Sequence, residues 1–300
     1  MHDVIIAGGG PAGITAGIYA ARARLKTAIV EKLMPGGQAA VTDFIENYPG
    51  FPEGIAGADL MAHMREQAER FGCEFESGEV TAVDMNQKTL TTPTQTYDWK
   101  SLIIATGADP RKLQVPGEEN LKGRGISFCA TCDGALFSGR RVAVVGGGDS
   151  AVKEALFLTK FASHVYIIHR RQELRAEKII QEKAFENEKI EFIWDSIVTE
   201  IRGEQRVKNL GIKNVKTGEE SELPVDGAFI YIGRVPNTSL FDVKKDTAGY
   251  ILTDEDMNTS KKGVFAAGDC RSKAHRQVAT AVGDGAAAAM SAEAYIAELE

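Results

Sequence analysis

The 300-residue sequence predicts an α/β protein built from two similar three-layer domains, the second inserted in the first. Three observations support this fold class. A short apolar strand that runs into a glycine-rich turn and then a helical pattern occurs twice, from Val4 and from Val142. Each copy is followed by an apolar strand that ends at a glycine, with a proline three residues later. A last apolar strand, in the stretch GVFAAGD at 263–269, has no partner of its own nearby in the chain.

The first copy is a βαβ unit. Strand Val4 to Ala7 enters the turn GGGPAG at 8–13, and a second strand, Thr27 to Val30, ends at Glu31. The glycines of this GxGxxG pattern suit a tight turn, close approach to a pyrophosphate and close helix–strand packing. Unpaired N–H groups at the helix N-terminus attract phosphate. Glu31 is placed to accept a ribose hydroxyl, so this Rossmann-like unit predicts a non-phosphorylated dinucleotide such as FAD or NAD. A glycine-rich turn that binds nothing would leave Glu31 unexplained.

The second copy ends in a different charge. Strand Val142 to Val145 enters the turn GGGDSA at 146–151, and strand Val165 to Ile168 follows the helix. The position that Glu31 holds in the first copy is His169 here, followed by Arg170, Arg171 and Arg175. Arginines at this place suit a 2′-phosphate through charge-assisted, often bidentate, hydrogen bonds. The second Rossmann-like dinucleotide-binding domain is therefore expected to take NADP, although a solvated basic helix start is the alternative.

The later strands divide the chain. LIIATGADP at 102–110 and FIYIGRVPN at 229–237 each close one domain. We expect the first domain to comprise residues 1–112 and 246–300, and the second to comprise 113–245. Two crossings between globular halves would permit a hinge. Asp269, at the turn after the last strand, could accept a hydrogen bond from a polyol such as the ribityl chain of FAD, and could equally cap the next helix.

Composition excludes several classes of protein. The net charge is −7, which argues against general affinity for nucleic acid or an anionic membrane surface. There is no run of about 18 apolar residues, so no membrane span is expected. The opening MHDVIIAGGG forms a strand and a turn rather than a signal peptide, so we expect a cytoplasmic protein.

Two of the four cysteines stand in FCATCD at 128–133. As a zinc half-site, Cys129 and Cys132 would need two more Cys or His ligands, and none is suitably spaced, so no metal is expected. A structural disulfide is uncommon in a cytosolic chain. Beside two nucleotide sites, the pair is best interpreted as redox-active, with Asp133 as the adjacent acid–base group. Cys73 and Cys270 stand alone and are expected in the core.

These motifs together resemble the low-molecular-weight, bacterial-type thioredoxin reductases. The matching stretches also include PGGQ at 35–38, ENYPG at 46–50, HRRQELRAEK at 169–178, GRVPNT at 233–238 and RQVATAVGDG at 276–285. The resemblance implies a homodimeric flavoprotein that passes electrons from NADPH through FAD to the CxxC pair and on to thioredoxin. It also implies a large rotation of one domain against the other.

The resemblance further implies roles for single residues. Cys132 would face the flavin, Cys129 would attack the disulfide of the partner, and Asp133 would handle the proton. Gln38 and Asn47 would lie along FAD, with Asp269 and Gln277 near the ribityl chain and the ring system. The expected cofactor-binding residues are Gly8, Gly10, Pro11, Ala12, Gly13, Glu31, Gly37, Gln38, Asn47, Thr106, Gly107, Gly146, Gly148, Asp149, Ser150, His169, Arg170, Arg171, Arg175, Gly268, Asp269, Arg276 and Gln277.

One departure concerns the helix after the second glycine motif. The family commonly has two acids there, whereas this chain has Lys153-Glu154. Related flavoenzymes that use NADH or ferredoxin, or that act as dithiol oxidases, are the alternative function. A redox-responsive binding protein with a structural flavin is a further alternative from another class, but it leaves the CxxC and the second nucleotide site without a purpose.

Overall fold

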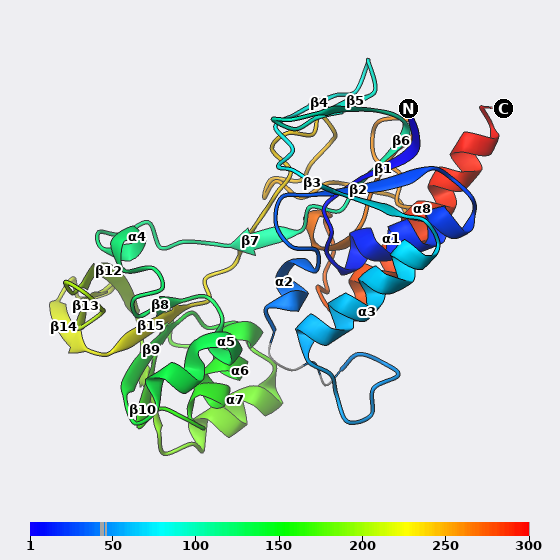
Figure 1. Ribbon diagram of the computed structural model, residues 1–300. Helices are drawn as coiled ribbons and strands as arrows, with labels where there is room; N and C mark the ends of the chain where they lie inside the picture. Colours follow the sequence, from blue (N-terminus) through cyan, green and yellow to red (C-terminus); the bar gives the residue numbers. More distant parts are fainter. Residues whose placement is uncertain (43–44, 46, 300) are drawn as a thin grey trace. The chain divides into compact units, whose positions relative to one another are not determined.

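A computed structural model describes residues 1–42, 45 and 47–299, and omits the side chains of Thr131 and Cys132. The chain folds as two compact units (Figure 1). The first unit comprises Met1–Asp109 and Val235–Glu300, and the second comprises Pro110–Arg234. The second unit is therefore inserted in the first, and the chain returns to the first unit at Val235, earlier than the return near residue 246 expected from the sequence.

The first unit contains a sheet in the order β3-β2-β1-β6-β5-β4, with β17 paired to β6. Its strands are β1 (His2–Ala7), β2 (Thr27–Glu31), β3 (Glu74–Ser77), β4 (Ala82–Asp84), β5 (Thr89–Thr91), β6 (Thr96–Ile104) and β17 (Val264–Ala266). Its helices are α1 (Pro11–Arg22), α2 (Gly37–Ala40), α3 (Gly57–Arg70), α8 (Val278–Ala297) and the 3-10 turn η2 (Gly268–Cys270). Strands β3, β2, β1, β6 and β17 run parallel, whereas β4 and β5 form an antiparallel extension.

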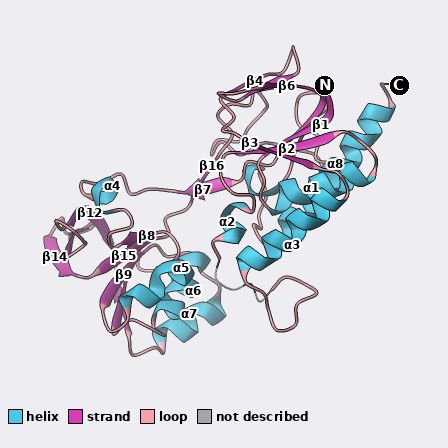
Figure 2. Cartoon of the chain, in the orientation of Figure 1, coloured by secondary structure: helices cyan, strands magenta, loops and turns pink. Residues whose placement is uncertain are grey.

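The central strand β1 separates two cores because its side chains alternate between faces of the sheet. Val4 and Ile6 pack with residues of α1, α3 and α8, the three long helices that Figure 2 shows on one side of this sheet. Ile5 and Ala7 face the opposite core, which includes Phe241. A strand buried on both faces reads as a continuous apolar run, as the segment VIIA does.

The second unit repeats this plan. Its parallel sheet has the order β11-β10-β9-β15-β8, and a separate antiparallel sheet has the order β12-β13-β14. The strands are β8 (Ile126–Ser127), β9 (Arg141–Val145), β10 (His164–Ile168), β11 (Ile190–Ile193), β12 (Ser196–Arg202), β13 (Asn209–Asn214), β14 (Glu220–Pro224) and β15 (Gly227–Ile230). The helices are α4 (Glu118–Leu121), α5 (Ala130–Asp133), η1 (Gly134–Phe137), α6 (Asp149–Leu158) and α7 (Lys178–Phe185).

Strand β9 divides the second unit as β1 divides the first. Val142 and Val144 pack toward α6 and α7, and Ala143 and Val145 pack toward the antiparallel sheet β12–β14. The duplicated architecture expected from the sequence is thus present, and the α/β fold class with two Rossmann-like units is confirmed.

The two segments that join the units pair with each other as strands β7 (Ala108–Pro110) and β16 (Arg234–Pro236).

Cys73 and Cys270 are buried free thiols, as expected. Among the described residues, no helix has both the length and the apolar composition needed to cross a membrane.

Candidate active site

The first glycine turn is closed at both ends and open in the middle. Gly8 has φ +106°, and a Cβ there would collide with the carbonyl oxygen of Ala105. A Cβ on Gly13 would collide with the carbonyl oxygen of Gly8. Gly10 has open space around its Cβ position and precedes Pro11 at the first position of α1. An anion therefore has room beside Gly10, at the end of the helix where N–H groups lack internal partners.

Glu31 connects this turn to a cavity. Its Oε2 accepts a hydrogen bond from the Gly9 N–H at 2.7 Å, and its Oε1 accepts one from the Leu33 N–H at 3.2 Å. The same side chain lines a cavity of about 280 Å³ together with Met34, Phe75 and other residues. A carboxylate offers about four acceptor positions, so Glu31 retains capacity for a ribose hydroxyl.

Distant segments converge on this turn. The Gly36 N–H donates to the Gly9 carbonyl at 2.6 Å, which places Gly37, the first residue of α2, beside Gly10, and Gln38 follows it as an exposed residue. Gly268 lies against Ala12, because a Cβ on Gly268 would be 2.8 Å from the Cβ of Ala12. The Asn47 side-chain amide donates to Gln277 Oε1 at 3.1 Å. In the ENYPG stretch, Glu46 lies outside the described residues.

Thr106 and Gly107 form hydrogen bonds that connect two segments of the first unit. The Thr106 hydroxyl donates to the Asn237 carbonyl at 2.6 Å, and the Asn237 N–H donates to the Gly107 carbonyl at 3.0 Å. These bonds tie the end of β6 to the segment that follows β16. The expected contact of Thr106 and Gly107 with a cofactor stays a prediction.

The turn that carries Asp269 is held by an acid that the sequence analysis did not identify. Asp284 of α8 accepts hydrogen bonds from the Gly268 N–H at 3.0 Å, from Arg271 at 2.8 Å and from Lys273 at 2.7 Å. Both ion pairs are largely buried, with side-chain exposures of 11–13%. Asp284 lies in the VGDG portion of the C-terminal motif, which was the available signal. Arg276 lies over the Tyr250 ring, 4.1 Å from its centroid.

The second glycine turn repeats the geometry of the first. Gly146 has φ +148°, and a Cβ there would collide with the Tyr231 carbonyl oxygen. Gly148 has open space and precedes α6, where Asp149 and Ser150 are exposed. His169 is buried against Gly147. Its burial, together with the positive charges of nearby arginines, lowers the pKa of His169, which favours the neutral imidazole.

Arg170, Arg171 and Arg175 are exposed next to this turn. Within the described part of the chain, none of the three guanidinium groups forms an ion pair. The structure thus brings the predicted arginines and the second glycine turn together in one unit. Unpaired arginines beside an open helix N-terminus suit a ligand with phosphates in two places.

The cysteine pair belongs to the same unit. Cys129 is half-buried and disulfide-bonded, and its N–H donates to the Ser127 hydroxyl oxygen at 3.0 Å. The side chain of Cys132 lies outside the described ones. Among the described atoms, two hydrogen bonds hold the start and end of the short helix α5: the Ala130 N–H donates to the Tyr231 hydroxyl at 2.7 Å, and the Asp133 N–H donates to the Cys129 carbonyl at 3.2 Å.

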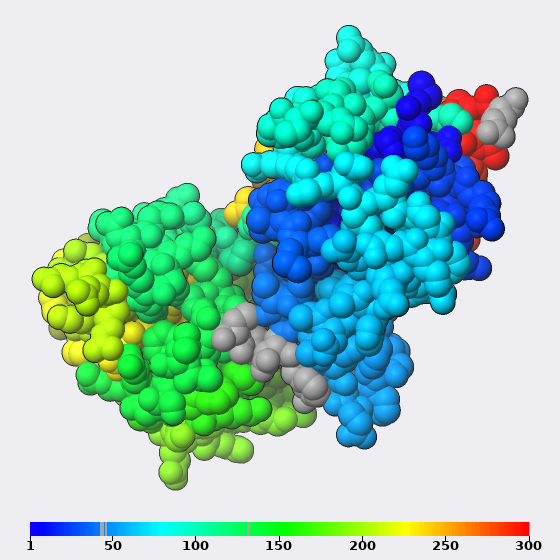
Figure 3. All heavy atoms as spheres, in the orientation of Figure 1, coloured from blue at the N-terminus to red at the C-terminus, as the bar shows by residue number. Residues whose placement is uncertain are grey.

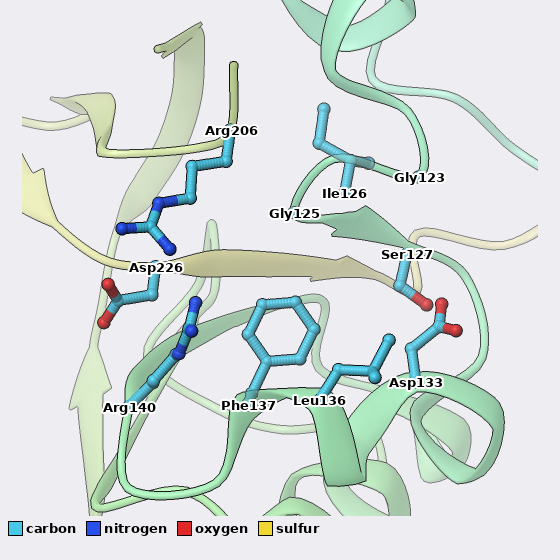
Figure 4. Close-up of a pocket in the computed structure, with 10 residues that line it drawn as sticks. All are labelled: Gly123, Gly125, Ile126, Ser127, Asp133, Leu136, Phe137, Arg140, Arg206 and Asp226. Carbon is cyan, nitrogen blue, oxygen red and sulfur yellow. The ribbon is translucent and has the colours of Figure 1, made fainter. Parts of the chain in front are cut away.

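Asp133 lines a pocket of about 190 Å³ (Figure 4). Figure 4 shows Asp133 and Ser127 at one end, Phe137 in the middle, and Arg140, Arg206 and Asp226 at the other end. The acid next to the cysteine pair therefore borders open space in the folded second unit. A carboxyl in this position can exchange protons with solvent or with a bound group.

Two further side chains near α5 were missed by the sequence analysis. Burial, with the charge of Glu154 as the next cause, raises the pKa of Tyr231, so its phenol stays neutral. Burial raises the pKa of Glu154 to about 7, and its Oε2 has no hydrogen-bond partner among the described residues. The acid after Lys153 was visible in the sequence, but its burial was not.

The described residues contain no group of three or more His, Cys, Asp or Glu side chains placed to hold a metal ion. Two glycine turns of one geometry, one in a unit with Glu31 and one in a unit with the arginines, together with disulfide-bonded Cys129, define a dinucleotide-dependent disulfide reductase. The chain belongs to the pyridine nucleotide-disulphide oxidoreductase family, whose profile matches residues 2–285.

Similar proteins show to which kind of disulfide reductase the chain is related. The thioredoxin reductase of Listeria monocytogenes is 50% identical over 306 residues, covering 100% of this chain and 95% of the relative. That of Bacillus subtilis is 48% identical over 305 residues, covering 100% and 96%. The crystal structure of Lactococcus lactis thioredoxin reductase is 49% identical, with a TM-score of 0.92 and coverage of 99% and 100%. The chain is thus a member of the thioredoxin reductase family, and the resemblance noted in its motifs is confirmed.

The protein is accordingly an enzyme, a flavoprotein disulfide reductase that uses FAD and NADPH. The residues present fit both cofactors. The open space at Gly10 and the carboxylate of Glu31 fit a dinucleotide with a free ribose hydroxyl. The open space at Gly148 and the unpaired arginines fit one with a 2′-phosphate.

Proposed function

We propose that the enzyme passes electrons from NADPH through FAD to the Cys129/Cys132 pair, and from there to the disulfide of a thioredoxin. The observation that carries this proposal is the composition of the second unit. It holds disulfide-bonded Cys129, the acid Asp133 at an open pocket, and three exposed arginines, without ion pairs among the described residues, beside the helix N-terminus at Gly148. The first unit would hold FAD through the residues around Gly10, Glu31 and Gly268.

The roles of the side chains follow from their positions. When bound, FAD supplies the chemistry that links hydride transfer from a nicotinamide to two-electron reduction of a disulfide. Cleavage of the Cys129/Cys132 bond takes up two electrons and, for two neutral thiols, two protons. Asp133 would exchange the proton of one thiol. Cys129 as a thiolate would then attack the partner disulfide, and Cys132 would displace the partner from the mixed disulfide, releasing a dithiol and re-forming the Cys129/Cys132 bond.

We further propose a cytoplasmic homodimer. Two of the four cysteines are buried free thiols, which is typical of proteins from reducing compartments. The dimer is implied by the resemblance to the family. Sedimentation of the holoenzyme would measure the assembly directly, and a mass equal to one chain would contradict the dimer.

The electron path is tested by flavin reduction without oxygen. NADPH is expected to bleach the visible band of the oxidised flavin rapidly, and NADH slowly, because only NADPH can engage the arginines. Cys132→Ser is expected to keep this bleaching and to lose turnover with thioredoxin. Turnover by this variant at the wild-type rate would contradict the proposed path, and fast bleaching by NADH alone would contradict the donor.

A further inference from the structure

The arginines of the second unit stand on a segment that is anchored from beneath. This arginine segment, residues 170–177, is exposed except at two positions: Leu174 and Ala176 are 8% and 6% exposed and belong to the core under α6 and α7. Arg170, Arg171 and Arg175 point away from that core as exposed residues. The segment has neither helix nor strand structure, so its shape depends on individual contacts.

Polar contacts supply that shape, and three of them hold residues 175–177. The Arg175 N–H donates to the Gly147 carbonyl at 2.7 Å. The Gln181 side-chain amide of α7 donates to the Ala176 carbonyl at 2.6 Å. The Glu177 N–H donates to Asp149 Oδ1 at 2.8 Å. Of these, only the Asp149 contact uses a side chain of the second glycine motif itself, and it joins residues 28 positions apart in the sequence.

Repulsion between the arginines means that such contacts are needed to keep the segment in one shape. Three like charges lie close enough together for each to affect His169, and no acid among the described residues pairs with any of them. Their mutual repulsion favours a spread-out segment when no anion is bound. A segment already held in place loses less conformational entropy on binding, which strengthens the binding of the anion that it fits.

Asp149 carries a negative charge that is unfavourable for binding phosphate nearby. It is the first residue of α6, beside the open space at Gly148 where phosphates are expected. A carboxylate there repels a pyrophosphate, so its presence needs a compensating role. A favourable interaction with the helix dipole is the simplest one. The bond to Glu177 indicates a second role, since it turns the carboxylate toward the arginine segment.

We propose that Asp149 is a positioning residue that makes the second unit selective for a 2′-phosphorylated nucleotide, by holding the arginine segment through the Glu177 N–H. The inference rests on the proposed function, in which this unit binds NADPH. In this inference the arginines bind the 2′-phosphate. Asp149 positions the arginines, although its own charge repels the pyrophosphate expected beside Gly148.

The test measures nucleotide binding to the full-length holoenzyme by titration calorimetry, without turnover. The probes are 2′,5′-ADP and 5′-AMP, which differ by the 2′-phosphate. Asp149→Ala is expected to lower the preference for 2′,5′-ADP over 5′-AMP about tenfold, the effect of losing one hydrogen bond to a charged group. Asp149→Asn keeps an acceptor oxygen and is expected to keep the preference, while binding both nucleotides more tightly because the repelling charge is gone.

A second variant removes the donor instead of the acceptor. Glu177 has φ −56°, which proline can adopt, so Glu177→Pro deletes the N–H and leaves Asp149 in place. We expect the same loss of preference as in Asp149→Ala. The matched control is Asp84→Ala in the first unit, an exposed acid that also accepts a backbone N–H at 2.8 Å and is expected to leave the preference unchanged.

The outcomes separate the inference from the proposed function. If wild-type enzyme prefers 2′,5′-ADP and both Asp149→Ala and Glu177→Pro keep that preference, the role of Asp149 is refuted and NADPH binding stands. If the variants keep the preference and differ from wild type only by a lower melting temperature, Asp149 stabilises α6 and does not position the arginines. If the wild-type enzyme shows no preference for 2′,5′-ADP, the assignment of NADPH to this unit fails first.

Discussion

Tyr231 joins two parts of the second unit at the scale of a single residue. Its carbonyl oxygen lies where a side chain on Gly146 would stand, and its hydroxyl accepts the Ala130 N–H at the start of α5. The residue therefore contacts both the glycine turn and the helix that begins directly after Cys129. An unsatisfied buried N–H costs about 1–3 kcal/mol, so the phenol stabilises the position of α5.

Glu154 makes stability depend on pH. Its carboxyl pKa rises from 4.5 to about 7 in the folded protein, because burial disfavours the charged form. The folded chain therefore holds this proton more tightly than the unfolded chain between those values. The contribution of the neutral carboxyl is complete below pH 4.5, falls as pH rises toward 7 and is lost above it.

We therefore expect Glu154→Gln to be about as stable as wild type at acid pH and more stable above neutral pH, by up to about 3 kcal/mol. The free energy of unfolding in denaturant, measured across this range, gives the difference at each pH. Glu182→Gln, at an exposed position of α7, is the control and should change stability little at either end. A constant difference between wild type and Glu154→Gln at all pH values would contradict the burial of a charge.

At the scale of elements, α1 and α8 approach each other through small residues. A Cβ on Gly285 of α8 would collide with the backbone carbonyl of Ala12 in α1, whereas Gly283 on the same helix faces open space. Backbone atoms cannot move aside as a flexible side chain can, so added volume at Gly285 must push the helices apart.

The two glycines form a matched pair of substitutions. Gly285→Ala is expected to destabilise the first unit by about 1–3 kcal/mol and to weaken retention of FAD, because Ala12 lies in the first glycine turn. Gly283→Ala is expected to stabilise the protein by about 0.5–1 kcal/mol, since alanine favours the helix and meets no neighbour. Thermal melting and the flavin content after dialysis measure both effects. Equal melting temperatures for the two variants would show that α8 does not pack as described.

Local patterns predicted the elements that carry the site, and long-range contacts escaped prediction. In each copy a strand, a six-residue glycine turn and a helix follow one another directly in the sequence. The geometry of the turns that begin at Gly8 and Gly146 could therefore be predicted from local sequence. The bonds from Asp149 to Glu177, and from Asn47 to Gln277, join segments 28 and 230 residues apart. The antiparallel sheet β12–β14 also went unpredicted, and the burial of Glu154 and the partners of Asp284 depend on which helices meet.

At the scale of the whole molecule, the two units have separate cores. The buried clusters around Val4 and Ile5 contain only residues of the first unit, and those around Val142 and Ala143 contain only residues of the second. Figure 3 shows the chain in space-filling form, with the inserted second unit in green and yellow. Two cores joined by two segments can unfold in two steps.

We therefore expect calorimetry of the full chain to resolve two melting transitions with different ligand responses. A ligand that binds only the folded state stabilises it by about 2.7 kcal/mol at a hundred times its dissociation constant. FAD should raise one transition, that of the unit with Gly10 and Glu31, and 2′,5′-ADP should raise the other. The double change Arg170→Ala with Arg171→Ala should abolish the shift by 2′,5′-ADP and leave the shift by FAD intact. If 2′,5′-ADP instead raises the FAD-sensitive transition equally, the two cores unfold together, and the units are not thermodynamically separate.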